Sequence, residues 1–179
     1  QKNRLGGLAK RGAWVKEVRE NAKEILVLDA GDLLFKKFFN PVPENELEMA
    51  TQKAQLIIES FNLMGYHAIG IGDDDLSLGK EFLLEISKKA HFPFLSSNLL
   101  DELSGKPLFQ PYLIKEINGL RIGIFSLLSP DVFFGQSDLR RKGVTFLPPI
   151  DVAQSMVKEL QPKADLIILL SHLGYQKDV

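Results

Sequence analysis

Short aliphatic runs alternate along the chain with longer segments in which apolar residues recur every three or four positions. The short runs are typical of buried strands, and the longer segments are typical of amphipathic helices. Their alternation predicts an α/β fold. Helices are predicted over residues 8–21, within 41–65, within 79–90 and over 150–160. Strands are predicted over residues 24–28, 67–71, 92–100 and 165–174.

Two local signals in this pattern are especially clear. The segment 41–65 opens with prolines and acidic residues, carries a periodic apolar stripe and ends at Gly65, as helices often do. Within residues 111–128, two strand-like runs flank Asn118-Gly119, a dipeptide that favours a two-residue hairpin. Because a hairpin joins antiparallel strands, a purely parallel doubly wound sheet is not expected.

The overall composition fits one globular domain covering residues 1–179. The chain is long enough for one sizeable core, with 45% hydrophobic residues. The formal net charge of −1 gives no general attraction to a nucleic-acid polymer or to anionic lipid. There is no cysteine, which excludes disulfides and thiolate metal sites. The longest apolar runs, such as residues 166–170, are far shorter than the roughly 20 residues of a membrane helix, and nothing reads as a signal peptide.

Polar residues follow three of the aliphatic runs directly. Asp32 follows the first run, three consecutive aspartates at 73–75 follow the second, and His172 ends the last. In α/β sheets, side chains just past the carboxyl ends of neighbouring strands meet in one crevice. Convergence of Asp32, the aspartates 73–75 and His172 is therefore expected. These oxygen and nitrogen donors suit Mn, Fe, Zn, Co or Ni better than a calcium cage.

A plainer interpretation applies to each of these loops alone, because Asp and Gly after a strand are ordinary turn residues. Three such loops together favour a site. His67, His91 and Trp14 are interpreted as structural, with Trp14 in the core on one helical face with Val15. The basic run 140–143 is interpreted as a solvated loop rather than an anion clamp.

Other catalytic arrangements fit less well. The chain contains no Walker glycine-lysine loop and no nucleophile elbow, and the "GIG" at 70–72 lacks the further glycine of a dinucleotide fingerprint. Ser171 and His172 are adjacent on a predicted strand and so point to opposite faces, which makes them a poor catalytic couple.

In order along the chain, a set of motifs resembles the calcineurin-like metallophosphoesterases, in particular their 5′-nucleotidase and UDP-sugar hydrolase branch. The motifs are "GGLAKRGAWVKEVR", "ILVLDAGDLL", "FNLMGYHAIGIGDDDLSLG", "FPFLSSNL", "PYLIKEINGLRIGIFSLLSP" and "ADLIILLSHLG". The resemblance implies a four-layer αββα sandwich, with two mixed β-sheets flanked by helices. It also implies hydrolysis of phosphate esters, with a nucleotide or nucleotide sugar as substrate and two divalent metals that activate water.

The same resemblance assigns roles to individual residues. Asp32 matches the carboxylate that bridges the two metals, and His172 matches a histidine ligand of the second metal. Asp73 stands where the family has a metal-binding asparagine, and Asp74 and Asp75 stand where it has a catalytic His-Asp or His-Glu pair. An ionised Asp74 cannot supply the cation of that histidine, and it adds negative charge where a phosphate must bind.

The resemblance begins at Gly6 and implies that two family motifs lie outside this chain. Asp-x-His would precede Gln1, and Gly-His-x-His would follow Val179, so the chain is expected to be a fragment. Family members are often exported, which implies a periplasmic or extracellular location.

Two other functions stay open beside a phosphoesterase. The altered loop at residues 73–75 also fits a catalytically degenerate domain that binds a metal or a nucleotide as an accessory module. A hydrolase of another oxyanion, such as a sulfur species, is the further alternative.

Overall fold

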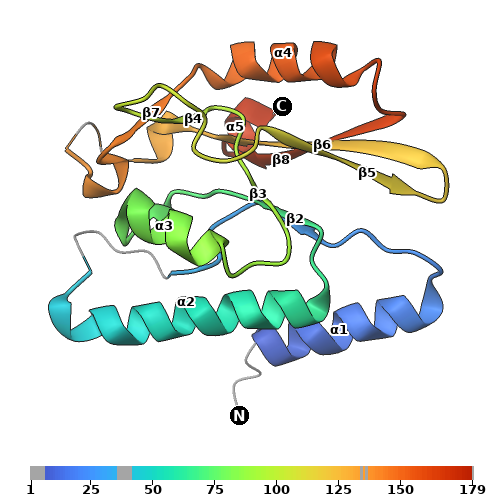
Figure 1. The fold of residues 1–179 in the computed structure, drawn as a ribbon, viewed down its shortest axis with the longest axis horizontal. Helices are drawn as coiled ribbons and strands as arrows, with labels where there is room; N and C mark the ends of the chain where they lie inside the picture. Colours follow the sequence, from blue (N-terminus) through green and yellow to red (C-terminus); the bar gives the residue numbers. More distant parts are fainter. Residues whose placement is uncertain (1–6, 36–41, 134, 136, 179) are drawn as a thin grey trace.

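The structure is a computed structural model that describes residues 7–35, 42–133, 135 and 137–178. Two β-sheets lie face to face, and helices cover the outer side of each (Figure 1). The first sheet is parallel and contains β1 (Leu28–Asp29), β2 (Ala68–Gly70) and β3 (Phe94–Leu95). Its outer side carries α2 (Glu44–Met64) and α3 (Gly79–Ser87), and α1 (Leu8–Asn21) lies beside one end of α2.

The second sheet is mixed. It contains β5 (Tyr112–Ile117), β6 (Leu120–Leu128) and β8 (Leu166–His172), with β5 antiparallel and β8 parallel to β6. Helix α4 (Pro149–Leu160) covers its outer side (Figure 1). The predicted four-layer αββα sandwich is therefore confirmed, although within the described residues only the second sheet is mixed.

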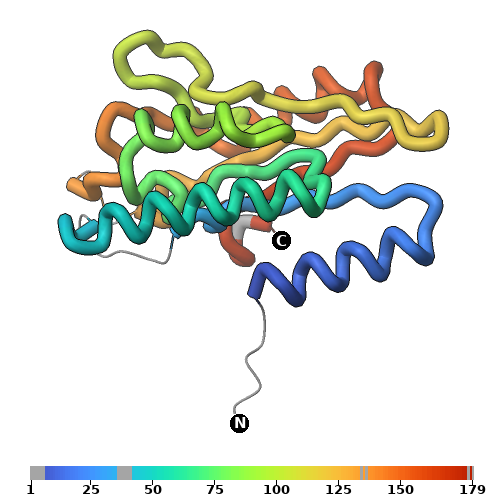
Figure 2. The backbone as a smooth tube through the Cα atoms, turned by 60° about the horizontal axis from the view of Figure 1, so that its bottom comes forward, coloured from blue at the N-terminus to red at the C-terminus, as the bar shows by residue number. Residues whose placement is uncertain are grey.

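Shorter elements connect these layers. They are the antiparallel pair β4 (Leu99–Asp101) and β7 (Val144–Phe146), the 3₁₀ turns η1 (Asp74–Leu76), η2 (Pro130–Val132) and η3 (Leu139–Arg141), and α5 (Tyr175–Asp178). The smooth backbone trace shows α1 set apart from the sheets at one edge of the molecule (Figure 2). No helix in the described part of the chain has the length and apolar character needed to cross a membrane.

Three apolar clusters fill the spaces between the four layers. Residues of α2 and α3, such as Ile58 and Leu83, pack on the first sheet. Strand β6 separates the other two clusters: Ile124 faces the first sheet, and Phe125 faces α4. Neighbouring side chains of a strand point to opposite faces, so an almost continuous apolar run is what a strand buried on both sides requires.

The two clearest local predictions are confirmed. Helix α2 ends at Gly65, which adopts the left-handed conformation with φ 63°. In the hairpin between β5 and β6, Asn118 and Gly119 have φ values of 51° and 80°, and Ile117 pairs with Leu120. Positive φ at both turn residues is the geometry that favours Asn-Gly in a two-residue hairpin. The predicted strand at 24–28 is shorter, because only Leu28–Asp29 joins the ladder.

The prediction that Trp14 lies in the core is wrong. Its side chain is 66% exposed, whereas its neighbour Val15 is only 5% exposed. Successive residues of a helix are rotated by about 100°. Helix α1 turns Val15 inward and packs Gly12 beside Met64 of α2, where a Cβ on Gly12 would lie 3.5 Å from Met64 Cε. Trp14 is thereby directed away from that contact.

Candidate metal centre

The structure brings Asp32, Asp73 and His172 together. Asp32 follows β1, Asp73 follows β2, and His172 is the last residue of β8 in the other sheet. One ligand atom from each of the three residues lies within 4.8 Å of the other two. The cluster thus forms where the carboxyl ends of strands from both sheets meet, as the pattern of polar residues at strand ends predicts.

Asp32 is placed by an unusual backbone. It has φ 59°, in the left-handed region that Asp tolerates better than most residues. The loop around it packs directly on the loop after β2. A Cβ on Gly31 would lie 2.3 Å from Gly72 N, and a Cβ on Gly72 would lie 2.2 Å from Asp32 Oδ1. Both positions therefore need glycine for the two loops to approach this closely.

Asp75 joins these two loops. Its Oδ2 accepts hydrogen bonds from the backbone N–H groups of Asp32 and Gly72, both at 2.9 Å. Its Oδ1 accepts from Leu33 N at 2.9 Å and Leu34 N at 3.0 Å. Burial raises the pKa of Asp75 to about 6, while these N–H groups favour its ionised form. The side chain is a structural clamp that holds Asp32 in place.

His172 faces the two carboxylates with one ring nitrogen. Its Nε2 lies 3.3 Å from Asp32 Oδ2 and 3.3 Å from Asp73 Oδ1. Its Nδ1 lies 3.2 Å from the backbone oxygen of Ala30, to which it can donate. Such a backbone contact orients the ring and leaves Nε2 for a ligand. The hydrogen bond to Asp32, and then that to Asp73, raise the pKa of His172 to about 10.

Arg140 is the residue that the sequence interpretation missed. The run 140–143 was predicted to be a solvated loop, but the Arg140 side chain is only 6% exposed. Its Nη1 donates to Asp73 Oδ2 at 2.5 Å and to Asp74 Oδ1 at 2.8 Å, and its Nη2 donates to Asp138 Oδ2 at 2.8 Å. A buried cation is needed here because several carboxylates leave water together. Arg140 is therefore buried, and not solvated as predicted, because its charge compensates the carboxylates of the acidic loop.

This arginine also affects the titration of its partner. Burial alone would raise the pKa of Asp73, but the hydrogen bond with His172 and the charge of Arg140 lower it overall. Asp73 is thus an ionised carboxylate with a partner on each oxygen: His172 near Oδ1 and Arg140 on Oδ2. The pKa of Arg140 is raised, chiefly by its hydrogen bond to Asp138.

A second buried cation anchors the segment that carries Arg140. Lys80 of α3 pairs with Asp101 of β4 and donates to the backbone oxygen of Gly143 at 3.0 Å. Gly143 has φ 75°, and a Cβ there would lie 2.9 Å from Lys80 Nζ. Lys80 therefore ties the end of η3 and the start of β7 to the rest of the fold, close to Arg140 in the chain.

Asp74 and Asp75 do not present their carboxylates to the cluster. Asp74 donates its backbone N–H to Asp32 Oδ1 at 2.9 Å and directs its carboxylate to Arg140. Asp75 is bound to backbone groups, as described above. That these two residues stand at the positions of the family's catalytic pair stays a prediction.

The structure also shows the contacts of the other histidines and of the serine beside His172. His67 accepts a hydrogen bond from Val27 N at 3.1 Å through Nδ1, which is a structural contact. His91 is exposed. Ser171 Oγ donates to Asp178 at 2.5 Å, away from the carboxylates that His172 faces. The prediction that Ser171 and His172 form no catalytic couple agrees with this geometry.

The donor atoms fit a divalent first-row metal. Two carboxylate oxygens and an imidazole nitrogen form a set that suits Mn, Fe, Zn, Co or Ni. The Asp32 side chain is 35% exposed, so solvent and a ligand can reach the cluster, whereas Asp73 is almost fully buried. The orientation of His172 through Ala30 is the usual arrangement of a metal-binding histidine.

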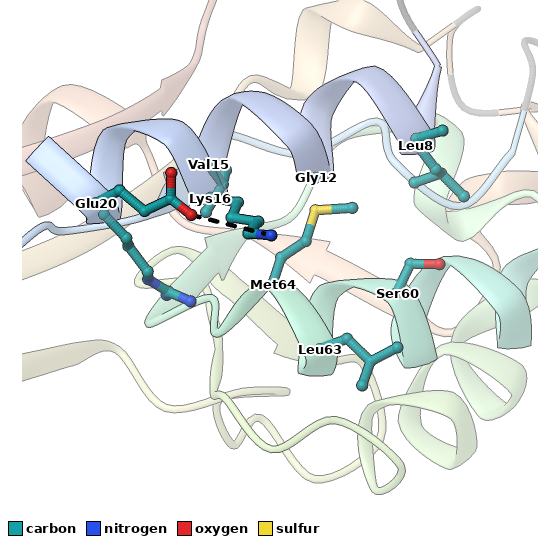
Figure 3. A pocket seen from close by; sticks show the side chains of 10 residues that line it. Leu8, Gly12, Val15, Lys16, Glu20, Ser60, Leu63 and Met64 are labelled. Carbon is teal, nitrogen blue, oxygen red and sulfur yellow. Dashed lines mark ion pairs between the residues drawn. The ribbon is translucent and has the colours of Figure 1, made fainter.

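A groove elsewhere on the molecule lacks such chemistry. It has a volume of about 570 Å³ and lies between α1 and α2, where Leu8, Leu63 and Met64 are among the lining side chains (Figure 3). The ion pair drawn there joins Lys16 and Glu20 at 3.9 Å, and both side chains are largely exposed. Exposed ion pairs of this kind contribute little to the stability of the fold.

Comparison with known proteins supports the assignment of the fold. The chain is 29% identical to a 5′-nucleotidase of Vibrio cholerae over 178 residues, which cover 96% of this chain and 31% of that protein. The crystal structure of a 5′-nucleotidase precursor from Thermus thermophilus has a TM-score of 0.74 and 32% identity, covering 97% of this chain and 32% of that one. The calcineurin-like phosphoesterase YfkN of Bacillus subtilis has a TM-score of 0.78 at 24% identity, covering 100% and 57%. No protein-family model matches the chain.

These likenesses define the fold: it is the fold of the calcineurin-like phosphoesterase YfkN. In sequence, nearly the whole chain is similar to part of a 5′-nucleotidase. It spans about a third of the length of the 5′-nucleotidases that it matches.

Proposed function

We propose that this chain contributes a metal site to a phosphoesterase of the 5′-nucleotidase type, which hydrolyses a nucleotide or nucleotide sugar. The observation that carries the proposal is the convergence of Asp32, Asp73 and His172, from three separate strand ends, within 4.8 Å. The names of the 5′-nucleotidases among its relatives support the substrate class. Export to the periplasm or the cell surface is part of the same proposal.

In this proposal Asp32, Asp73 and His172 hold a divalent metal. When bound, such a metal activates water and offsets charge on the phosphoryl oxygens. Asp32 offers Oδ2 from a backbone that Asp75 clamps, and Asp73 offers Oδ1 while Arg140 holds Oδ2. His172 offers Nε2, with its ring oriented by Ala30. A second metal bridged through Asp32 would need further ligands beside the three residues that the described part of the chain brings together.

The test is phosphate release from a nucleoside 5′-monophosphate and from an aryl phosphate ester. Activity is expected with Mn²⁺ and is expected to be lost with a chelator. Replacing a residue that only hydrogen-bonds to a metal ligand already lowers metal affinity or activity by about 10- to 100-fold. Asp32→Ala, which removes a ligand itself, should therefore lower the activity by at least about 100-fold. Asp151→Ala, which changes an exposed carboxylate on α4, is the matched control and should keep full activity. Equal rates for Asp32→Ala and the unchanged protein would contradict the proposal.

A catalytically degenerate domain is the second candidate, and one observation favours it. Asp74 and Asp75 are engaged by Arg140 and by backbone N–H groups, so neither is free to protonate a leaving group. If the domain is degenerate, combining Asp73→Asn with Asp74→His should create phosphatase activity or raise it by the roughly 10²- to 10⁴-fold that a general acid contributes. Asp138, which pairs with Arg140 in the unchanged protein, is kept in that variant. High activity of the unchanged protein, with no gain in the variant, would rule out degeneracy.

A further inference from the structure

Asp73 connects the candidate metal cluster to a buried arginine. Its Oδ1 lies 3.3 Å from His172 Nε2, within the cluster, and its Oδ2 lies 2.5 Å from Arg140 Nη1. One oxygen of this carboxylate therefore faces the other residues of the cluster, and the second oxygen binds the guanidinium. Any cation that the cluster binds is separated from the positive charge of Arg140 by little more than that group.

Water cannot screen this charge well, and the charge is fixed in place. The Arg140 and Asp73 side chains are only 6% and 8% exposed. Asp138 holds the guanidinium from another side, through Nε at 3.1 Å and Nη2 at 2.8 Å. The ring of Phe133 lies 5.2 Å from its central carbon. Buried charges interact more strongly than exposed ones, because salt and water screen them less.

We propose that Arg140 is a built-in counter-charge of the metal site, which lowers the affinity of the Asp32, Asp73 and His172 cluster for a divalent cation. The inference rests on the proposed function in that the cluster binds such a cation. It assigns Arg140 a tuning role: the arginine makes a strongly acidic loop compatible with the fold while leaving the bound metal exchangeable.

The direction in which the metal affinity changes when Arg140 is removed separates this role from a purely structural one. If Arg140 only helps the loop to fold, its removal disorders Asp73 and weakens metal binding. If Arg140 acts as a counter-charge, its removal takes away a repulsion and strengthens metal binding. Repulsion between a divalent ion and a unit charge at this separation is large enough to change the affinity by about tenfold or more.

The experiment is titration calorimetry with Mn²⁺ alone, at one fixed pH, on the whole protein. Arg140→Met is expected to bind Mn²⁺ about tenfold more tightly or better. Arg140→Lys keeps the charge and should stay within about threefold of the unchanged protein. Arg121→Met is the matched control, because it removes an arginine that pairs with Asp165 at the surface, and it should leave the affinity unchanged.

Asp74→Asn tests the same idea by removing a negative charge, which should weaken Mn²⁺ binding, and it leaves Arg140 in place. Asparagine keeps the shape of Asp74 and can still accept from Arg140, but it lacks the negative charge. Because Asp74 is not one of the cluster residues, the expected loss of about tenfold in Mn²⁺ affinity reports charge alone. This variant keeps the test decisive if Arg140→Met fails to fold.

Each outcome has a definite meaning. Equal or weaker Mn²⁺ binding by folded Arg140→Met, or unchanged binding by Asp74→Asn, overturns the counter-charge. The absence of Mn²⁺ binding in every form of the protein overturns the metal site and this inference together. The expected affinity shifts without any phosphatase activity would support the counter-charge and reject only the proposed function.

Discussion

Asp75→Asn is expected to lower the free energy of unfolding by about 2–6 kcal/mol. The carboxylate accepts two backbone N–H groups on each oxygen, from the loop after β1 and from Gly72. An amide in its place turns an NH₂ group toward two of these donors in either orientation. Each buried donor left without an acceptor costs about 1–3 kcal/mol. Urea denaturation followed by circular dichroism measures the loss.

Asp74→Asn is the matched control for this prediction. It changes the neighbouring aspartate in the same way, but the affected oxygen faces Arg140, which keeps its bonds to Asp73 and Asp138. A loss of only about 1 kcal/mol is expected there, because the amide oxygen can still accept from Arg140 and no buried donor is left without an acceptor. Equal stability of Asp75→Asn and the unchanged protein would show that Asp75 does not clamp the two loops.

The part of the site that could be predicted from sequence follows from a local rule. Asp32, Asp73 and His172 each come at the end of an aliphatic run, and the carboxyl ends of strands in α/β sheets share an edge. Hydrophobic periodicity alone identifies those runs and most of the helices. This rule accounts for Asp32 and Asp73, which follow neighbouring strands of one sheet, whereas His172 reaches the cluster because the second sheet packs against the first.

Arg140 could not be predicted in this way. It is 67 residues from Asp73 in the chain, in the irregular segment between β6 and β7, where no periodicity indicates which side chains turn inward. Arginine is mostly exposed, so a basic run is normally interpreted as surface. The available signal was charge balance: consecutive aspartates that are buried beside a strand require a cation, and the run 140–143 could supply it.

Asp75 shows a related limit. Its position after β2 is evident from sequence, but the direction of its side chain depends on the 3₁₀ turn η1 that begins at Asp74. The three adjacent aspartates consequently differ in their partners: His172 and Arg140 for Asp73, Arg140 for Asp74, and backbone N–H groups for Asp75. The motif identifies the loop, and only the geometry separates the roles.

The affinity of the cluster for a divalent cation is expected to rise about tenfold for each pH unit between pH 6 and 8.5. Hydrogen bonds to Asp32 and Asp73 raise the pKa of His172 to about 10, so its ring is protonated in the metal-free protein throughout this range. A metal ligand must be a neutral imidazole, and binding therefore releases that proton. Asp73 adds no slope here, because its pKa is lowered and it is already ionised.

Calorimetry with Mn²⁺ in two buffers of different ionisation enthalpy measures the proton release, and about one proton per ion is expected. His172→Gln is the control: it should bind more weakly and lose most of the pH dependence. A pH-independent affinity in the unchanged protein would mean that His172 is neutral before the metal arrives or is not a ligand. Structures at the same pH with and without Mn²⁺ would separate these two cases, because a ligand must exchange its contacts with Asp32 and Asp73 for the ion.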